Sequence, residues 1–171
     1  MDLVSAPEIA ATIAVLAYIG LVFAAGVSDI LTLTIPNRFT GAIVLLYPSY
    51  VLAAGQPVDW IGAVLVAAAA LALGFFLFSF GWWGGGDAKL FGAVALWAGP
   101  SAILELVLTT TIAGGAIAVF IFLQYYLPHA ISTGFFRFKA AMPERKSLPM
   151  PYGVALAVGA LYGAFTMLKV S

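Results

Sequence analysis

The stretch from Trp60 to Trp83 reads WIGAVLVAAAALALGFFLFSFGWW and carries no charged side chain. A helix rises 1.5 Å per residue, so an apolar run of about 20 residues can cross a bilayer core roughly 30 Å thick. Hydrocarbon offers no water to backbone N–H and C=O groups, and a helix satisfies these groups within itself. The run therefore predicts a transmembrane helix.

The rest of the chain has the same character. Of its 171 residues, 64% are hydrophobic and 8% are charged, whereas soluble domains carry about 25% charged residues. This composition predicts an all-α polytopic membrane protein of about six transmembrane helices, which form a single domain over residues 1–171. The other uncharged runs are Ile9–Val27, Phe39–Ala54, Leu90–Gly99, Leu106–Leu127 and Tyr152–Leu168.

Composition also excludes several classes of function. The formal net charge is zero, so no broad positive field points to a nucleic-acid partner. The absence of cysteine removes disulfides, thiolate metal sites and a cysteine nucleophile. A histidine-based metal site or a Ser-His-Asp triad would depend on His129, the only histidine. We therefore expect no metal site. The sequence does not predict the oligomeric state.

The basic residues predict the orientation of the chain. If all the runs cross the membrane, all basic residues except Lys169 fall in alternate connectors; they are Arg38, Lys89, Arg137, Lys139, Arg145 and Lys146. Connectors rich in lysine and arginine face the cytoplasm. We therefore expect a multi-pass protein of the inner (cytoplasmic) membrane, with both termini outside.

Asp29 and Asp87 lie at the ends of apolar runs that should avoid charge. A carboxylate costs roughly 2.5–3.5 kcal/mol at the centre of a transmembrane helix, so such residues suggest a functional site. If the connectors alternate between the two sides of the membrane in this way, both aspartates lie at cytoplasmic helix ends. Two carboxyl groups that share one proton can hydrolyse a peptide bond, because one activates water while the other protonates the carbonyl oxygen. This chemistry requires no metal or organic cofactor.

Three motifs in this order carry a family resemblance. The segment GGGDAK at residues 84–89 resembles the GxGD motif of intramembrane aspartyl proteases, in the form found in type IV prepilin leader peptidases. Asp29-Ile30 followed by Ile35-Pro36-Asn37 resembles the region of their first catalytic aspartate, and PYGVA at residues 151–155 resembles their last-helix motif.

The resemblance implies an endopeptidase that removes the leader from prepilin-like precursors at the cytoplasmic membrane face. Asp29 and Asp87 would then be the catalytic pair. The larger prepilin peptidases add a cytoplasmic segment with paired cysteines and methylate the new N-terminus. Because this chain has no cysteine, we expect cleavage without N-methylation, as in the short enzymes of Flp/Tad pili. The supporting motif residues would be Gly84, Gly85, Gly86, Lys89, Pro36, Asn37, Pro151 and Tyr152.

Other interpretations of these residues stay open. A small carrier could use Asp29 and Asp87 to bind a proton or cation near a broken helix, and an assembly scaffold would explain the hydrophobicity alone. Asp87 could also cap the helix that follows it, and Lys89 could be an interfacial anchor. The tryptophans are interpreted as interfacial aromatics; they are Trp60, Trp82, Trp83 and Trp97.

Overall fold

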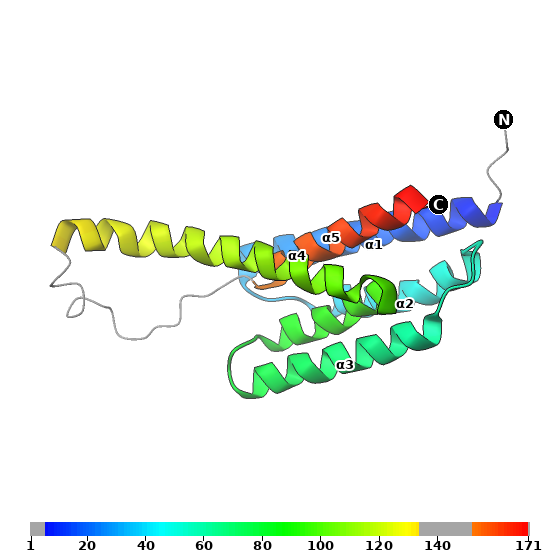
Figure 1. Cartoon of the computed structure of the whole chain (residues 1–171), viewed down its shortest axis with the longest axis horizontal. Helices are drawn as coiled ribbons and strands as arrows, with labels where there is room; N and C mark the ends of the chain where they lie inside the picture. The colour runs from blue at the N-terminus through cyan, green and yellow to red at the C-terminus, as the bar shows by residue number, and fades with distance from the viewer. Residues whose placement is uncertain (1–5, 134–151, 171) are drawn as a thin grey trace.

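A computed structural model of the chain describes residues 6–133 and 152–170. Every regular element in these residues is an α-helix, which confirms the all-α prediction for this part of the chain. The helices, shown in Figure 1, are α1 (Ala6–Thr32), α2 (Asn37–Ala53), α3 (Trp60–Ser79), α4 (Gly85–Thr133) and α5 (Tyr152–Val170).

Three of the described helices are long and apolar enough to cross a membrane. They are α1, α3 and the Gly85–Gln124 part of α4, and the apolar stretch Tyr152–Phe165 of α5 is shorter. Helix α2 has 17 residues. Multiple apolar helices make this a multi-pass membrane protein, as expected. The count of about six spans stays a prediction.

Helix α4 consists of two limbs that run in opposite directions (Figure 1). The chain turns at Gly99, whose φ of 59° and ψ of −172° interrupt the helix, and Pro100 follows. A positive φ suits glycine, because it has no Cβ to clash with the backbone. The predicted stop at Gly99-Pro100 is therefore confirmed. The first limb is almost entirely buried between its neighbours, with Leu90 and Val94 fully covered.

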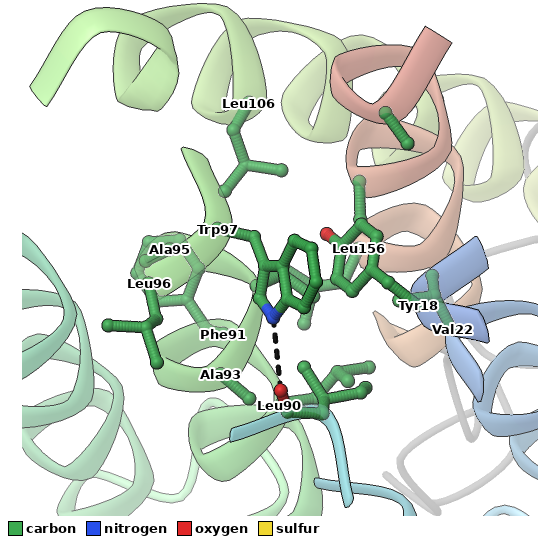
Figure 2. Packing of buried hydrophobic residues seen from close by; sticks show 14 of the residues in the cluster. Tyr18, Val22, Leu90, Phe91, Ala93, Ala95, Leu96, Trp97, Leu106 and Leu156 are labelled. Carbon is green, nitrogen blue, oxygen red and sulfur yellow. Dashed lines mark hydrogen bonds between the residues drawn. The ribbon is translucent and has the colours of Figure 1, made fainter. Parts of the chain in front are cut away.

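Trp97 on this first limb joins three helices in the core (Figure 2). Its indole stacks on Tyr18 of α1, with ring centroids 4.3 Å apart, and its Nε1–H donates to the carbonyl of Ile43 in α2 at 3.0 Å. Only 3% of Trp97 is exposed. The prediction that Trp97 is an interfacial aromatic is wrong, because the limb that carries it runs through the centre of the bundle.

Close contacts between small residues place α5 against both α1 and α4. A Cβ built on Gly26 of α1 would lie 2.9 Å from the Cβ of Ala157, and one built on Gly159 of α5 would meet the Thr110 hydroxyl of α4. Small residues of this kind let transmembrane helices approach closely. As a result, α5 lies alongside α1 (Figure 1).

Candidate active site

Asp29 lies in the last turn of α1, two residues beyond the predicted end of this span at Val27. The turn closes through the Leu33 N–H, which donates to the Asp29 carbonyl at 2.9 Å, with Leu33 at a φ of 52°. The Ser28 hydroxyl donates to the Thr34 carbonyl at 3.0 Å and holds the chain as it leaves the helix. The Asp29 side chain is 5% exposed and faces the interior.

Asp87 lies in the first turn of α4, on the buried limb. Its Oδ2 accepts a hydrogen bond from the Gly84 N–H at 3.2 Å. A carboxylate at this position satisfies one of the N–H groups that a helix start leaves free. The helix-capping interpretation of Asp87 is thus correct. The cap uses only one carboxylate oxygen, since Oδ1 has no hydrogen-bond partner among the described residues.

The structure brings the two carboxylates together, close enough for Asp29 to act electrostatically on Asp87. Each has one buried oxygen, Asp29 Oδ2 and Asp87 Oδ1, for which the described residues supply no hydrogen-bond partner. Most buried polar atoms are paired, so each exception calls for an explanation, and a catalytic role is one. The arrangement leaves one free oxygen on each of two neighbouring carboxyl groups.

Ile35 connects the three motifs. A Cβ built on Gly86 would lie 3.1 Å from the Ile35 Cβ, and one built on Gly153 would lie 2.6 Å from the Ile35 Cδ1. At Gly153 a side chain would force a neighbour to move, and at Gly86 it would make an unusually tight contact, so both glycines help the Asp29–Asn37 segment to fit between α4 and α5. Gly86 acts here through close approach of the backbone, as the glycine run predicted.

The start of α5 completes the surroundings of Asp29. A Cβ built on Gly153 would lie 2.8 Å from Asp29 Oδ2, and the backbone N–H groups of Gly153 and Val154 lie at the same carboxylate. A helix N-terminus favours a negative charge through its free N–H groups and its dipole. Asp29, at the end of α1, therefore lies beside the N-terminus of α5, and Asp87 lies at the N-terminus of its own helix, α4.

Lys89 and Asn37 form a direct link between two motifs that are far apart in the sequence. The Lys89 Nζ donates to Asn37 Oδ1 at 3.0 Å. Pro36 is the N-cap residue of α2, with a φ of −60°. Lys89 thus ties the start of α2 to the first turns of α4, beside Asp87.

The remaining predicted residues lie around this centre. The Tyr152 ring lies 6.2 Å from the Trp83 ring, which in turn meets Phe91 edge-on at 5.5 Å. A Cβ built on Gly85 would lie 3.6 Å from the Phe78 ring, which is ordinary contact. Pro151 lies outside the described residues, as do the basic residues from Arg137 to Lys146.

Sequence reasoning missed two parts of this site. One is the packing of Ile35 against Gly86 and Gly153, and the other is the pair of backbone N–H groups at Gly153 and Val154. The motifs contain both Ile35 and Gly153, but no local signal indicates that either one lies against the other or against Asp29, because these contacts depend on which helices are neighbours.

Comparison with known proteins agrees with this geometry. No curated protein and no solved structure matches the chain. Residues 16–119 match the type IV leader peptidase family, and the matched region contains both Asp29 and Asp87. Because the match covers more than half of the 171 residues, the chain belongs to the type IV leader peptidase family.

Proposed function

We propose that this protein is an aspartyl endopeptidase in which Asp29 and Asp87 form the catalytic pair. The family supports a leader peptidase that acts on pilin-like precursors. The observation that carries the aspartyl assignment is the pair of buried carboxylates, each with one unpartnered oxygen. The two groups come from α1 and α4 and meet at the convergence of all three motifs.

The proposed reaction needs one proton shared between the two carboxyl groups. The ionised carboxylate takes a proton from water as the water oxygen attacks the scissile carbonyl carbon, and the protonated one donates to the carbonyl oxygen. The tetrahedral intermediate then collapses: the C–N bond breaks as the protonated carboxyl group gives its proton to the leaving amine, and the other carboxylate takes a hydroxyl proton from the intermediate. The pair ends with one proton, as it began.

The helix starts at Gly85 and Tyr152 have a supporting role in this scheme. Their free N–H groups lie at Asp87 and Asp29 respectively, and such groups stabilise negative charge without reorganising during the reaction. They also fix the orientation of each carboxylate. The unpartnered oxygens are thereby left for water and the peptide.

We further propose that the precursor's apolar segment enters between the helices with its leader toward the cytoplasm. Both aspartates lie within one turn of a helix end, which fits cleavage at a membrane face and disfavours a carrier site at mid-membrane. The distribution of basic residues supports the cytoplasmic face. The absence of cysteine supports cleavage without N-methylation in a single Flp/Tad-type domain.

Substitution of the two aspartates tests this proposal. We expect Asp29→Asn and Asp87→Asn each to reduce cleavage of a co-expressed Flp-type prepilin by about 10²–10⁴-fold, the contribution of general acid–base catalysis. Cleavage is measured by the mobility shift of the precursor, with enzyme levels checked in the membrane fraction. The matched control is Glu105→Gln, which neutralises an exposed carboxylate on the second limb of α4.

The outcomes are distinct. Loss of cleavage in both variants at normal abundance, with Glu105→Gln active, supports the pair. Cleavage by either aspartate variant at the wild-type rate would show that the assignment is wrong. If the wild type cleaves none of several prepilin-like substrates, the carrier hypothesis becomes the one to test.

A further inference from the structure

The connection between α1 and α2 has an unusual backbone conformation next to the aspartate pair. Leu33 has a φ of 52°, and among the described residues it is the only one other than glycine with a positive φ. This left-handed conformation brings the Cβ of an ordinary residue close to the following carbonyl oxygen, so helices that end in this way usually do so on glycine or asparagine. A leucine here is therefore unfavourable and calls for an explanation.

The end of α3 shows that this chain does use glycine where a helix only has to end. Gly81 lies just after α3 with a φ of 73°, and its N–H donates to the Phe78 carbonyl at 2.9 Å. Leu33 lies just after α1, and its N–H donates to the Asp29 carbonyl at 2.9 Å. Glycine could form both turns, so the turn itself does not explain the leucine side chain.

Hydroxyl groups hold the chain on both sides of Leu33. The Thr32 hydroxyl donates to the Ser28 carbonyl at 2.8 Å and forms a hydrogen bond of 2.8 Å with the Thr34 hydroxyl. The Ser28 hydroxyl donates to the Thr34 carbonyl at 3.0 Å, and the next residue, Ile35, is buried. Strained conformations persist where the surrounding structure fixes them in this way, and they are concentrated at functional sites.

The Leu33 side chain is half exposed although it lies in the segment that joins the two aspartates. Its exposed fraction is 50%. The segment leads from Asp29 to Ile35, which lies against Gly86, and Gly86 directly precedes Asp87. Leu33 therefore exposes an apolar side chain at the aspartate end of the bundle, between one carboxylate and the neighbour of the other.

Two further apolar side chains extend this exposed surface. Ile30 and Leu31, in the last turn of α1, are 60% and 76% exposed. Exposed apolar surface that borders a reaction centre is typical of a binding face, because a hydrophobic segment gains free energy when it covers such a surface. Lipid chains can cover the exposed face of a regular helix, but they do not explain a leucine in a strained turn.

We propose that Leu33 is a specificity-determining residue whose side chain contacts the apolar segment of the pilin-like precursor at the aspartate pair. This inference rests on the proposed function, and the family supplies the class of substrate. The contact lies outside the two carboxyl groups, so it should bind the substrate and the transition state equally. Such a contact lowers KM and leaves kcat unchanged.

The test measures kcat and KM separately, with the full chain purified in detergent and a Flp-type prepilin as substrate. The main variant is Leu33→Asn, because asparagine is similar in size, adopts the left-handed conformation more readily and removes the apolar surface. We expect Leu33→Asn to raise KM by about ten-fold, the scale for covering part of a leucine side chain. Its kcat should equal that of the wild type, and its Tm should be no lower.

Two further variants separate the apolar contact from other effects. Leu33→Met keeps an apolar side chain of similar size and should have a KM close to that of the wild type. Leu52→Asn is the matched control, because it makes the same change at a leucine that is 88% exposed near the other end of α2. We expect Leu52→Asn to leave KM unchanged.

Each outcome decides the inference. An unchanged KM in Leu33→Asn would overturn it and assign this surface to lipid. A lower kcat at unchanged KM would also overturn it, because Leu33 would then act through the Asp29 backbone. An equal rise of KM in Leu33→Met would exclude an apolar contact.

Two points keep the test decisive. If Leu33→Asn is not recovered folded, Leu33→Gly replaces it, since glycine adopts this conformation without a clash. Failure of the proposed function is seen separately, as cleavage by Asp29→Asn at the wild-type rate, and it leaves the comparison of KM values for Leu33 valid.

Discussion

At the scale of single residues, Gly153 is the position where the least change should have the largest effect. Its missing side chain leaves room for both the Ile35 Cδ1 and the Asp29 Oδ2, which would lie 2.6 and 2.8 Å from an added Cβ. Neither neighbour can retreat easily, since Ile35 is buried and Asp29 is 5% exposed. A methyl group at this point must displace the carboxylate or open α5.

We therefore expect Gly153→Ala to reduce prepilin cleavage by about 10²-fold, the scale of a 1 Å misplacement of a catalytic group. The measurement is the cleavage rate at matched enzyme abundance. Gly163→Ala on the same helix is the control, because a Cβ there meets nothing within 4 Å. Equal rates for the two variants would mean that the Gly153 contact does not position Asp29.

The bond between Lys89 and Asn37 gives a second residue-scale prediction. Both side chains serve one contact of 3.0 Å, so removing either should have the same effect as removing both. We expect Lys89→Met and Asn37→Ala each to slow cleavage, and the double variant to be no slower than the single ones. Rates for the four proteins form a double-mutant cycle. Strictly additive losses would assign the two residues independent roles.

At the scale of helices, the packing of α5 on α4 depends on Gly159. A Cβ there would meet the Thr110 hydroxyl and lie 3.0 Å from the Leu106 carbonyl oxygen, and backbone atoms cannot move aside as a flexible side chain does. The contact matters for the site because the first residues of α5, Gly153 and Val154, lie at the Asp29 carboxylate. Packing along α5 and chemistry at its start are thus linked.

Gly159→Ala should destabilise the protein by about 1–3 kcal/mol, the usual cost of overpacking. Because about 1 kcal/mol shifts Tm by roughly 2–4 °C in a chain of this size, thermal unfolding in detergent should show a loss of several degrees. Gly115→Ala on α4 adds a Cβ that meets nothing within 4 Å and should not lower Tm. A Gly159→Ala protein as stable as wild type would contradict the tight α4–α5 contact.

The helices also show what could be predicted from the sequence. The three motifs located both aspartates and the glycine run, because these features are local. Trp97 was assigned to the interface, yet it lies in the core. In a membrane protein the lipid-facing and buried sides of a helix are both apolar, so hydropathy does not reveal which side faces lipid and which faces the protein interior. For the same reason the contact of Gly153 with Asp29 could not be predicted, since it depends on which helices are neighbours.

At the scale of the whole molecule, the orientation of the bundle is the central prediction. Helix α3 separates two exposed positions, Gln56 before its start and Ser79 at its end, by roughly 30 Å at 1.5 Å per residue. The chain has no cysteine, so a single cysteine introduced at either position is the only thiol. If the aspartate end faces the cytoplasm, Ser79 shares that side and Gln56 lies outside.

We expect a membrane-impermeant maleimide to label Gln56→Cys on intact spheroplasts, and to label Ser79→Cys only after permeabilisation. The measurement is the gel shift of the labelled protein, and each of the two variants serves as the control for the other. The reverse pattern would place the proposed active site on the outer face. Labelling of both on intact spheroplasts would contradict a crossing by α3.

The position of α5 in the chain has a consequence for biosynthesis. Asp29 on α1 leaves the ribosome well before Gly153 and Val154 on α5, which lie at its carboxylate. Until α5 is inserted, Asp29 lacks these N–H groups, and Ile35 lacks its packing contact with Gly153. On the proposed mechanism, a nascent chain therefore stays inactive until α5 is inserted, and a product truncated before α5 would not cleave prepilins.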